Sequence, residues 1–261
     1  MLRGTLDFLK MILESDEIIT DINDGLRLIA KRDGLTFGTD AYLLSAFVRK
    51  QTRARAVDLG SGTGIIPMLL LAKGKLASVE AVELQPDFAA LITRNAELNQ
   101  LSDRLHAHCT DVRMLTPERF GGTVDVVLSN PPYMHTGGKA NLSERKNIAR
   151  HEIAGGIGDF CDAASCILKY GGLFYTVFRP DRLCDLMDAL RRASLEVKRM
   201  TVVHARAELP PCLVLCESKK GAAPGLYVTP PLIMYTHGEH YTDTLSKIYE
   251  TGEFDEHYNR P

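Results

Sequence analysis

Residues 54–65 read ARAVDLGSGTGI, a short apolar run followed by a loop that contains three glycines. The run Ala54–Leu59 has the composition of a buried strand, and a helix is predicted from about Ile65 to Lys73, where Gly74 can end it. Glycines between a strand and a helix let the backbone turn tightly and approach a ligand. The segment therefore predicts a strand–loop–helix unit with a ligand site at the loop.

The spacing of these glycines argues against a nicotinamide or flavin cofactor. A dinucleotide-binding loop reads GxGxxG or GxGxxA, with a small residue at the sixth position. Here the sixth residue counted from Gly60 is Ile65, and the third glycine, Gly64, comes one place early. A different ligand is expected at this loop.

Short apolar runs continue to alternate with amphipathic stretches beyond this unit, which predicts a buried, mostly parallel sheet covered by helices. Further strands are predicted at 78–84, 104–110, 124–128, 173–178, 197–204 and 212–217, and helices at 86–99, 159–169 and 180–193. The fold class is therefore α/β and Rossmann-like, with seven strands and helices on both faces. One antiparallel edge strand is expected, because only the short Pro210-Pro211 link lies between the last two strands.

Composition limits the class of protein further. The chain has 261 residues, 45% hydrophobic and 25% charged, which suits one main domain at 51–261 preceded by a segment at 1–50. No run approaches the roughly 18 apolar residues of a membrane helix, and no signal peptide is recognisable, so a cytoplasmic protein is expected. The six cysteines have no metal-site spacing, so no metal is expected and they are interpreted as reduced and mostly buried. A net charge of −2 means that any nucleic-acid contact must come from local basic clusters.

The pattern DxGxGxG from Asp58 to Gly64 resembles motif I of the class I methyltransferases. That resemblance implies S-adenosyl-L-methionine as the cofactor, with its methionyl part at the glycine loop. Glu83 ends the second strand, where a carboxylate can accept hydrogen bonds from both ribose hydroxyls. Asp111 ends the third, placed to accept from the adenine amino group, with the backbone of Val112 donating to the ring. The predicted cofactor-binding residues are Thr39, Asp40, Asp58, Gly60, Ser61, Gly62, Gly64, Glu83, Leu84, Asp111 and Val112.

The tetrapeptide Asn130-Pro131-Pro132-Tyr133 follows the fourth predicted strand and faces the same crevice as the glycine loop. An exocyclic amine is a poor nucleophile because its lone pair is delocalised into the ring. The side-chain carbonyl of Asn130 and the backbone carbonyl of Pro131 can each accept one N–H of such an amine and draw the lone pair toward a methyl donor. The prolines hold these carbonyls rigidly, and Tyr133 offers a face for a planar base. These four residues are the predicted catalytic set.

The NPPY motif resembles motif IV of two groups of enzymes, the N6-adenine methyltransferases and the glutamine N5-methyltransferases of peptide release factors. Both act on a conjugated NH2, so the motif leaves the substrate open. A third alternative is a catalytically silent RNA-binding module that retains the fold.

The flanking segments indicate the first group. FGTDAYLL at 37–44, IARHE at 148–152, FRPDRL at 178–183 and PPLIMYTHGEHYTD at 230–243 are similar to the bacterial tRNA(Val) adenine-N6-methyltransferase family. The resemblance spans about residues 24–249 and implies methylation of the adenine 3′ of the anticodon. It places the N-terminal segment, through residues 37–40, over the cofactor pocket. A monomer is expected.

A polar loop at 135–158 follows the motif and carries basic residues that can contact phosphates. The predicted substrate-binding residues are Tyr133, Lys139, Arg145, Arg150 and His151. The alternative, a glutamine methyltransferase acting on a release factor, is less favoured: those enzymes usually carry a helical domain before the core, and the roughly 50 residues before Arg55 do not have that pattern.

Overall fold

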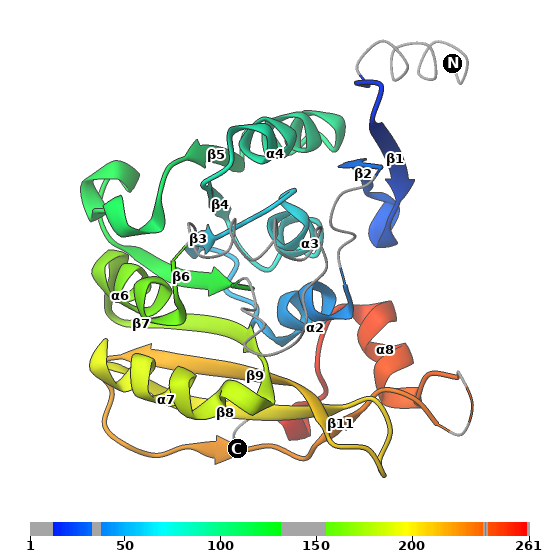
Figure 1. Ribbon diagram of the computed structural model, residues 1–261, viewed down its shortest axis with the longest axis vertical. Helices are drawn as coiled ribbons and strands as arrows, with labels where there is room; N and C mark the ends of the chain where they lie inside the picture. The colour runs from blue at the N-terminus through cyan, green and yellow to red at the C-terminus, as the bar shows by residue number, and fades with distance from the viewer. Residues whose placement is uncertain (1–12, 33–37, 132–154, 237, 239, 260–261) are drawn as a thin grey trace, which may run out of the picture.

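The computed structural model describes residues 13–32, 38–131, 155–236, 238 and 240–259. Within them, a nine-stranded sheet has the order β10-β8-β9-β7-β6-β3-β4-β5, and β11 also pairs with β8. The seven long strands are β3 (Arg55–Leu59), β4 (Ser78–Glu83), β5 (Leu105–Cys109), β6 (Val124–Ser129), β7 (Leu168–Phe178), β8 (Leu195–His204) and β9 (Pro211–Lys220). From β5 through β4, β3 and β6 to β7 the strands are parallel (Figure 1). The predicted α/β class is confirmed.

The antiparallel strand lies inside the sheet, and its predicted position at the edge was wrong. Strand β9 pairs antiparallel with β7 on one side and with β8 on the other. The short link at Pro210 and Pro211 does join two antiparallel neighbours, β8 and β9. An antiparallel pairing of these two strands does not determine which of them also pairs with β7. The two-residue strands β10 (Tyr227–Val228) and β11 (Leu232–Ile233) pair outside β8. Strands of two residues are too short to show the alternation of apolar and polar residues from which strands are predicted.

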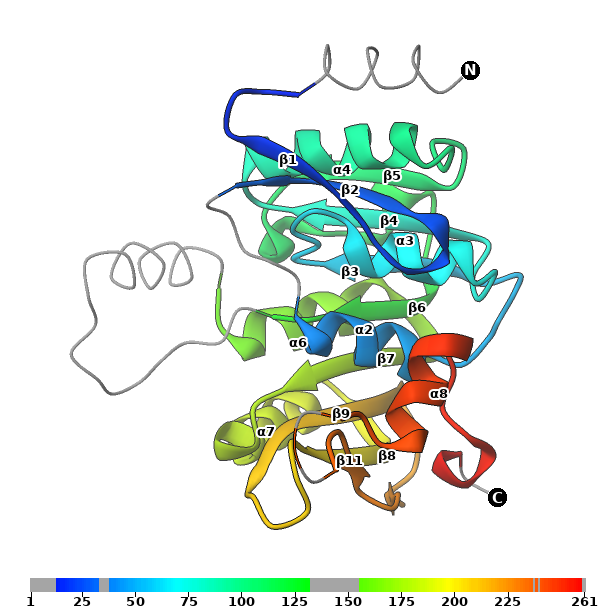
Figure 2. The same cartoon turned by 90° about the vertical axis from the view of Figure 1, so that its right-hand side faces the viewer.

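Helices cover both faces of the sheet (Figures 1 and 2). One core contains side chains from α2 (Thr39–Phe47), α3 (Ile65–Ala72), α4 (Pro86–Leu98) and α8 (Asp243–Thr251), and the other contains side chains from α6 (Ile157–Ile167) and α7 (Leu183–Arg192). The short helices are η1 (Asn23–Gly25), η2 (Val112–Met114), η3 (Pro117–Phe120), η4 (Pro180–Arg182) and η5 (Glu256–Tyr258). Strand β3 contributes side chains to both cores: Ala56 lies in the first core, and Val57 and Leu59 lie in the second.

Each strand and helix predicted between residues 54 and 217 is present, and the largest differences lie at two boundaries. Strand β7 begins at Leu168, five residues before the prediction, because Gly171 and Gly172 fall within an irregular stretch of the β6–β7 pairing and not in a turn. The helix predicted at 180–193 begins as η4 before α7. Helix α8 was not predicted.

The N-terminal segment contains a two-stranded hairpin that two asparagines attach to α4. The hairpin consists of β1 (Glu17–Asp21) and β2 (Arg27–Lys31). Asn95 accepts from the backbone N–H of Ile29 at 2.7 Å and donates to the Ile29 carbonyl at 3.1 Å, and Asn99, one turn later, makes the same pair of bonds with Arg27. Asn95 also donates to the Thr63 carbonyl at 2.9 Å. The hairpin, α4 and the glycine loop are therefore linked by one buried side chain.

Replacing Asn95 with alanine is expected to lower the free energy of unfolding by about 2–3 kcal/mol, because buried backbone groups of Ile29 and Thr63 lose their partners. Asn99→Ala is the matched control. That side chain is only partly buried, so water can replace it, and a loss of about 1 kcal/mol is expected. Urea unfolding measures both; equal losses for the two variants would contradict this account of the attachment.

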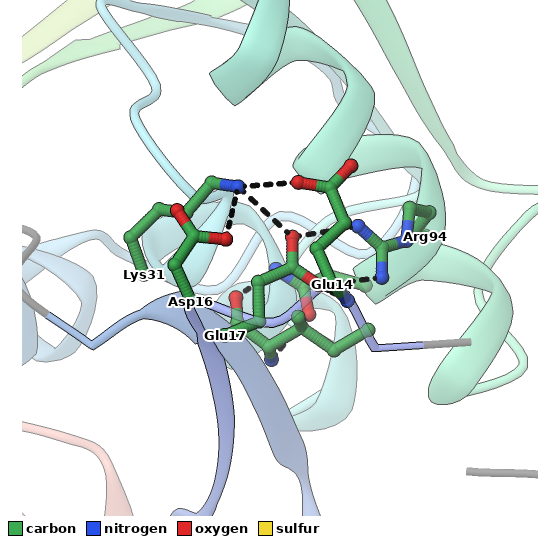
Figure 3. A network of polar contacts seen from close by, with 7 residues as sticks. Glu14, Asp16, Glu17, Lys31 and Arg94 are labelled. Atoms are coloured by element: carbon green, nitrogen blue, oxygen red, sulfur yellow. Dashed lines mark hydrogen bonds and ion pairs between the residues drawn. The ribbon is translucent and has the colours of Figure 1, made fainter. Parts of the chain in front are cut away.

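An ion network also holds the hairpin on α4, as Figure 3 shows. The carboxylate of Glu17, whose side chain is only 1% exposed, pairs with Arg94 of α4 at 2.8 Å and lies 3.5 Å from Lys31. Lys31 further contacts Glu14 and Asp16 at 2.6 and 3.1 Å. The hydrogen bond from Arg94 lowers the pKa of Glu17 below its usual value despite the burial.

Two buried cations bind the carbonyl end of α2. Lys75 is 2% exposed and donates to the carbonyls of Ser45, Ala46 and Val48 at 2.8–2.9 Å. Arg199 is 1% exposed, donates to the Phe47 carbonyl at 2.6 Å, and lies 3.7 Å from the centre of the Phe47 ring. Since cations stabilise helix C-termini, these contacts fix α2 in position.

Candidate functional site

The carboxyl ends of four adjacent strands bring most of the described candidate residues to one edge of the sheet. Leu59 of β3 lies opposite Ser129 of β6, and the Ser129 hydroxyl donates to the Leu59 carbonyl at 3.0 Å. The glycine loop and Asn130 therefore begin side by side. On the other side of β3, Glu83 is the last residue of β4 and lies opposite Cys109, the last residue of β5. Asp111 follows Cys109 by two residues. This edge is where open parallel sheets bind ligands.

The glycine loop is held close to the sheet. The N–H groups of Gly60 and Ser61 both donate to the Val82 carbonyl, at 2.9 and 3.0 Å. Gly60 has φ +72°, and a Cβ there would lie 3.3 Å from the Phe160 ring of α6. Gly62 has φ +57°, but a Cβ there would meet no described atom within 4 Å. The backbone at Gly62 is therefore approachable from outside, whereas that at Gly60 is packed against a helix.

Two acidic side chains lie beneath this loop. The buried Asp58 accepts from the Ser61 hydroxyl at 2.5 Å, and its other oxygen, Oδ1, has no hydrogen-bond partner among the described residues. Glu83 accepts from the N–H of Gly62 and of Gln85, both at 2.9 Å. These donors orient the Glu83 carboxylate. The site thus offers carboxylate oxygens to a ligand with cationic or hydroxyl groups.

Burial raises the pKa of Asp58 to about 7, and the neighbouring Glu83 charge acts in the same direction, against the Ser61 hydrogen bond. Burial also raises the pKa of Glu83, while its backbone donors oppose the shift. Burial is the largest cause of both shifts, because poor hydration disfavours the charged form of a carboxyl group.

The pKa of Asp58 predicts a pH-dependent stability that Asp58→Asn should remove. Between about pH 4 and 7 the folded protein retains a proton that the unfolded chain releases, so the free energy of unfolding falls as the pH rises through this window. The variant should be close to wild type at pH 4 and more stable at pH 8, by at most about 4 kcal/mol. Urea unfolding at the two values measures this. A difference between the proteins that does not change with pH would contradict it.

The third strand end carries a carboxylate that is already paired. Asp111 caps η2 by accepting from the backbone N–H of Arg113 at 2.9 Å, and the Arg113 guanidinium binds the same carboxylate at 2.5–3.1 Å. The hydrogen bond from Arg113 lowers the pKa of Asp111. Leu84 is partly buried next to Glu83, and Val112 is 6% exposed. A ligand that binds Asp111 must share it with Arg113, a partner that the sequence did not predict.

Asn130 contacts the N-terminal segment at the start of α2. Its side-chain nitrogen donates to Oδ2 of Asp40 at 2.9 Å, and Oδ1 of Asp40 accepts from the N–H of Ala41 at 2.9 Å. A carboxylate can only accept, so this bond identifies which end of the Asn130 amide is the NH2 and which is the carbonyl. Helix α2 starts at Thr39 with Gly38 as its N-cap. The structure therefore places Asp40 against the predicted catalytic residue.

Several predicted residues lie outside the described ranges: Pro132, Tyr133, Lys139, Arg145, Arg150 and His151. Pro131 is described and is buried. Phe160 and Asn95 contact the glycine loop and were not predicted as site residues; no spacing pattern marks them, because they come from helices distant in sequence.

Across the described residues, no helix is long and apolar enough to span a membrane, and no group of three or more His, Cys, Asp or Glu is arranged to hold a metal ion.

All six cysteines are free. Their predicted burial was mostly wrong: Cys161 and Cys216 are buried, but Cys109, Cys166 and Cys184 are exposed. Those three lie at a strand end and on exposed helix surfaces, where apolar character alone does not ensure burial.

Comparison with solved structures agrees on the fold. A predicted O-methyltransferase from Agrobacterium tumefaciens aligns with a TM-score of 0.65 and 24% identity over 83% of this chain and 98% of that one. The Methanocaldococcus jannaschii Trm5 in complex with adenosine aligns with a TM-score of 0.55 and 17% identity, over 81% of this chain and 57% of that one. At these identities the likeness concerns the fold alone.

Comparison with sequences identifies the family. The profile of the methyltransferase small domain family matches residues 31–193, more than half of the chain. A tRNA1(Val) (adenine(37)-N6)-methyltransferase of Bacteroides fragilis is 30% identical over 174 residues, 67% of this chain and 73% of the relative. The protein of the same name from Pedobacter heparinus is 28% identical over 67% of this chain and 74% of its own length. The chain is an enzyme of the methyltransferase small domain family and belongs with its tRNA1(Val) (adenine(37)-N6)-methyltransferases.

Proposed function

We propose that this enzyme transfers a methyl group from S-adenosyl-L-methionine to the N6 nitrogen of an adenine in tRNA, the adenine 3′ of the anticodon in tRNA(Val). The observation that carries the proposal is the position of Asn130. It is one residue beyond β6, beside the glycine loop that follows β3, with its amide oriented by Asp40. The names of the relatives from Bacteroides fragilis and Pedobacter heparinus support the same substrate.

The acidic side chains beside the glycine loop fit the proposed cofactor. S-adenosyl-L-methionine carries a sulfonium and an ammonium group, a ribose with two hydroxyls, and an adenine, and it supplies an electrophilic methyl group. Asp58 has a buried oxygen with no partner among the described residues, and backbone N–H groups orient the Glu83 carboxylate. Glu83 would hold the ribose, and Asp111 with Val112 the adenine. Thr39, Asp40, Gly60, Ser61, Gly62, Gly64 and Leu84 complete the proposed cofactor-binding set.

The chemistry required of the protein is the activation of a conjugated NH2. Asp40 holds the NH2 end of the Asn130 amide, so the carbonyl end is the one that accepts an N–H of the target. The Pro131 carbonyl accepts the second N–H. These two acceptors favour a more tetrahedral nitrogen as the new C–N bond forms, and no strong base or metal is required of the site. Pro132 and Tyr133 complete the proposed catalytic set.

An RNA loop is a favourable substrate for such a site. Its bases are unpaired, which reduces the cost of extruding the target, on the order of a few kcal/mol in a duplex. The net charge of −2 requires local basic groups, and Lys139, Arg145, Arg150 and His151 are the proposed contacts.

We expect the enzyme to act as a monomer in the cytoplasm, where tRNA is found. The N-terminal segment at 1–50 would lie over the cofactor pocket and meet the remaining domain through Asp40.

A glutamine methyltransferase is the second candidate, because the amide of glutamine presents a similar NH2. The described part of the segment before β3 contains the β1–β2 hairpin and α2, which does not resemble the helical domain usual in that group.

Incubation with cofactor labelled on the methyl group distinguishes the two candidates. The substrates are a tRNA(Val) transcript, the same transcript with the adenine 3′ of the anticodon replaced by guanine, and a purified release factor. Label should enter only the first. Equal labelling of both transcripts would refute the position, and label on the release factor alone would refute the RNA substrate.

A further inference from the structure

Four tyrosines between α2 and the segment before α8 form a continuous series of ring contacts, in which the central pair is stacked and the two outer pairs are tilted by 43–44°. The ring centres of Tyr42 and Tyr249 are 4.6 Å apart, those of Tyr249 and Tyr241 5.3 Å, and those of Tyr241 and Tyr235 5.5 Å. The planes of Tyr249 and Tyr241 differ by only 23°. We call this set the tyrosine stack. Both Figure 1 and Figure 2 show α8, which carries Tyr249, next to α2.

The tyrosine stack adjoins the candidate active site through the first turns of α2. Tyr42 belongs to α2 and follows Asp40 by two residues, and Asp40 binds the Asn130 side chain at 2.9 Å. Tyr249 contacts α2 as well: burial raises its pKa, and a hydrogen bond with the Thr39 side chain opposes the shift. One short stretch of α2 thus contacts both the catalytic asparagine and the stack.

The outer part of the tyrosine stack is open to solvent. Tyr42 is 5% exposed, whereas Tyr241 is 48% exposed and is one of the few exposed large aromatic side chains among the described residues. Tyr249 stacks against the Tyr241 ring, and the exposed remainder of that ring offers an aromatic surface on which a nucleobase can stack.

The backbone around Tyr241 is held in place. Tyr235 and Tyr241 face each other as an antiparallel bridge, and the N–H of Thr236 donates to the His240 carbonyl at 2.9 Å. Arg206 donates to the Gly238 carbonyl at 2.7 Å and brings a positive charge beside the stack. A ring fixed in this way loses little conformational entropy on binding, and the guanidinium can attract a phosphate.

We propose that Tyr241 is a stacking platform for an unpaired RNA base next to the target adenine. The proposal rests on the function proposed above and adds a substrate-positioning residue outside the predicted set. Its partner is single-stranded RNA, because planar stacking beside a cation matches a base and its phosphate.

Kinetics with full-length protein and a tRNA(Val) transcript test the role of Tyr241. Tyr241→Leu keeps an apolar side chain but removes the aromatic face, and is expected to raise the KM for tRNA by about 5-fold to 150-fold, with kcat and the KM for S-adenosyl-L-methionine nearly unchanged. Tyr241→Phe keeps the ring and should behave like wild type. Tyr170→Ala is the matched control: Tyr170 is 79% exposed but lies near the start of β7, at the opposite end of the strands, so no change is expected.

The inference would be overturned by a KM for tRNA in Tyr241→Leu within twofold of wild type, or by equal losses in the Phe and Leu variants. A rise in KM that Tyr170→Ala reproduces would also overturn it. If wild-type protein fails to methylate tRNA at all, the proposed function fails, and the inference with it. If wild type is active and Tyr241→Leu is unchanged, only the inference fails.

Discussion

Replacing Asn130 with alanine is expected to lower kcat for methyl transfer by about 100-fold to 1,000-fold, the usual cost of removing one fixed polar group that acts in the transition state. In the proposed mechanism the side-chain carbonyl of Asn130 accepts an N–H of the target amine, most strongly as the target nitrogen becomes tetrahedral, so the loss should appear in kcat more than in KM. Single-turnover transfer of a labelled methyl group to tRNA measures it.

Two controls separate catalysis from folding and cofactor binding in this variant. S-adenosylhomocysteine should bind Asn130→Ala almost as well as wild type, because most of the proposed cofactor contacts come from the ends of β3, β4 and β5. Asn130 is partly buried and bonded to Asp40, so the thermal midpoint should fall only slightly. A rate within threefold of wild type would rule out the role assigned to Asn130.

Replacing Arg199 with alanine is expected to lower the free energy of unfolding by about 3–5 kcal/mol, because it removes one partner of a buried ion pair. Arg199 lies 2.8 Å from the carboxylate of Glu217, which is left with Arg49 alone. The Phe47 carbonyl loses a donor at 2.6 Å, and the Phe47 ring loses its cation. Urea unfolding measures the loss.

Arg192→Ala is the matched control for Arg199. Arg192 lies 3.5 Å from Asp188 with both side chains 69% exposed, and such pairs contribute little. Its removal should change the free energy of unfolding by less than about 0.5 kcal/mol. Similar small losses for the two arginine variants would show that α2 does not depend on the buried cation.

The parts of the fold that follow from local sequence could be predicted. The apolar run at 54–59 and the glycines after it determine a strand and a loop through their own backbone preferences. Regular alternation beyond them implies parallel strands, and parallel strands align their carboxyl ends. That is why Glu83, Asp111 and Asn130 could be expected at the same edge as Gly60 before any coordinates.

The remaining features depend on contacts between distant residues. Asn95 forms hydrogen bonds with Ile29, 66 positions away, and its amide gives no sign of this in the sequence of α4. Arg199 is an arginine in a strand whose neighbours do not reveal that it is buried beneath α2. The Asp40–Asn130 contact joins residues 90 positions apart. Likewise, the position of β9 between β7 and β8 depends on which strand of a hairpin joins the sheet.

Mass spectrometry of nucleosides from the tRNA of a strain lacking this gene tests the central claim most directly. The claim is that the glycine loop and Asn130 together deliver a methyl group to an adenine N6. N6-methyladenosine should be missing from the purified tRNA(Val) of that strain, return when the wild-type gene is supplied, and stay missing when the Asn130→Ala gene is supplied. An undiminished amount of N6-methyladenosine in the deletion strain would contradict the account.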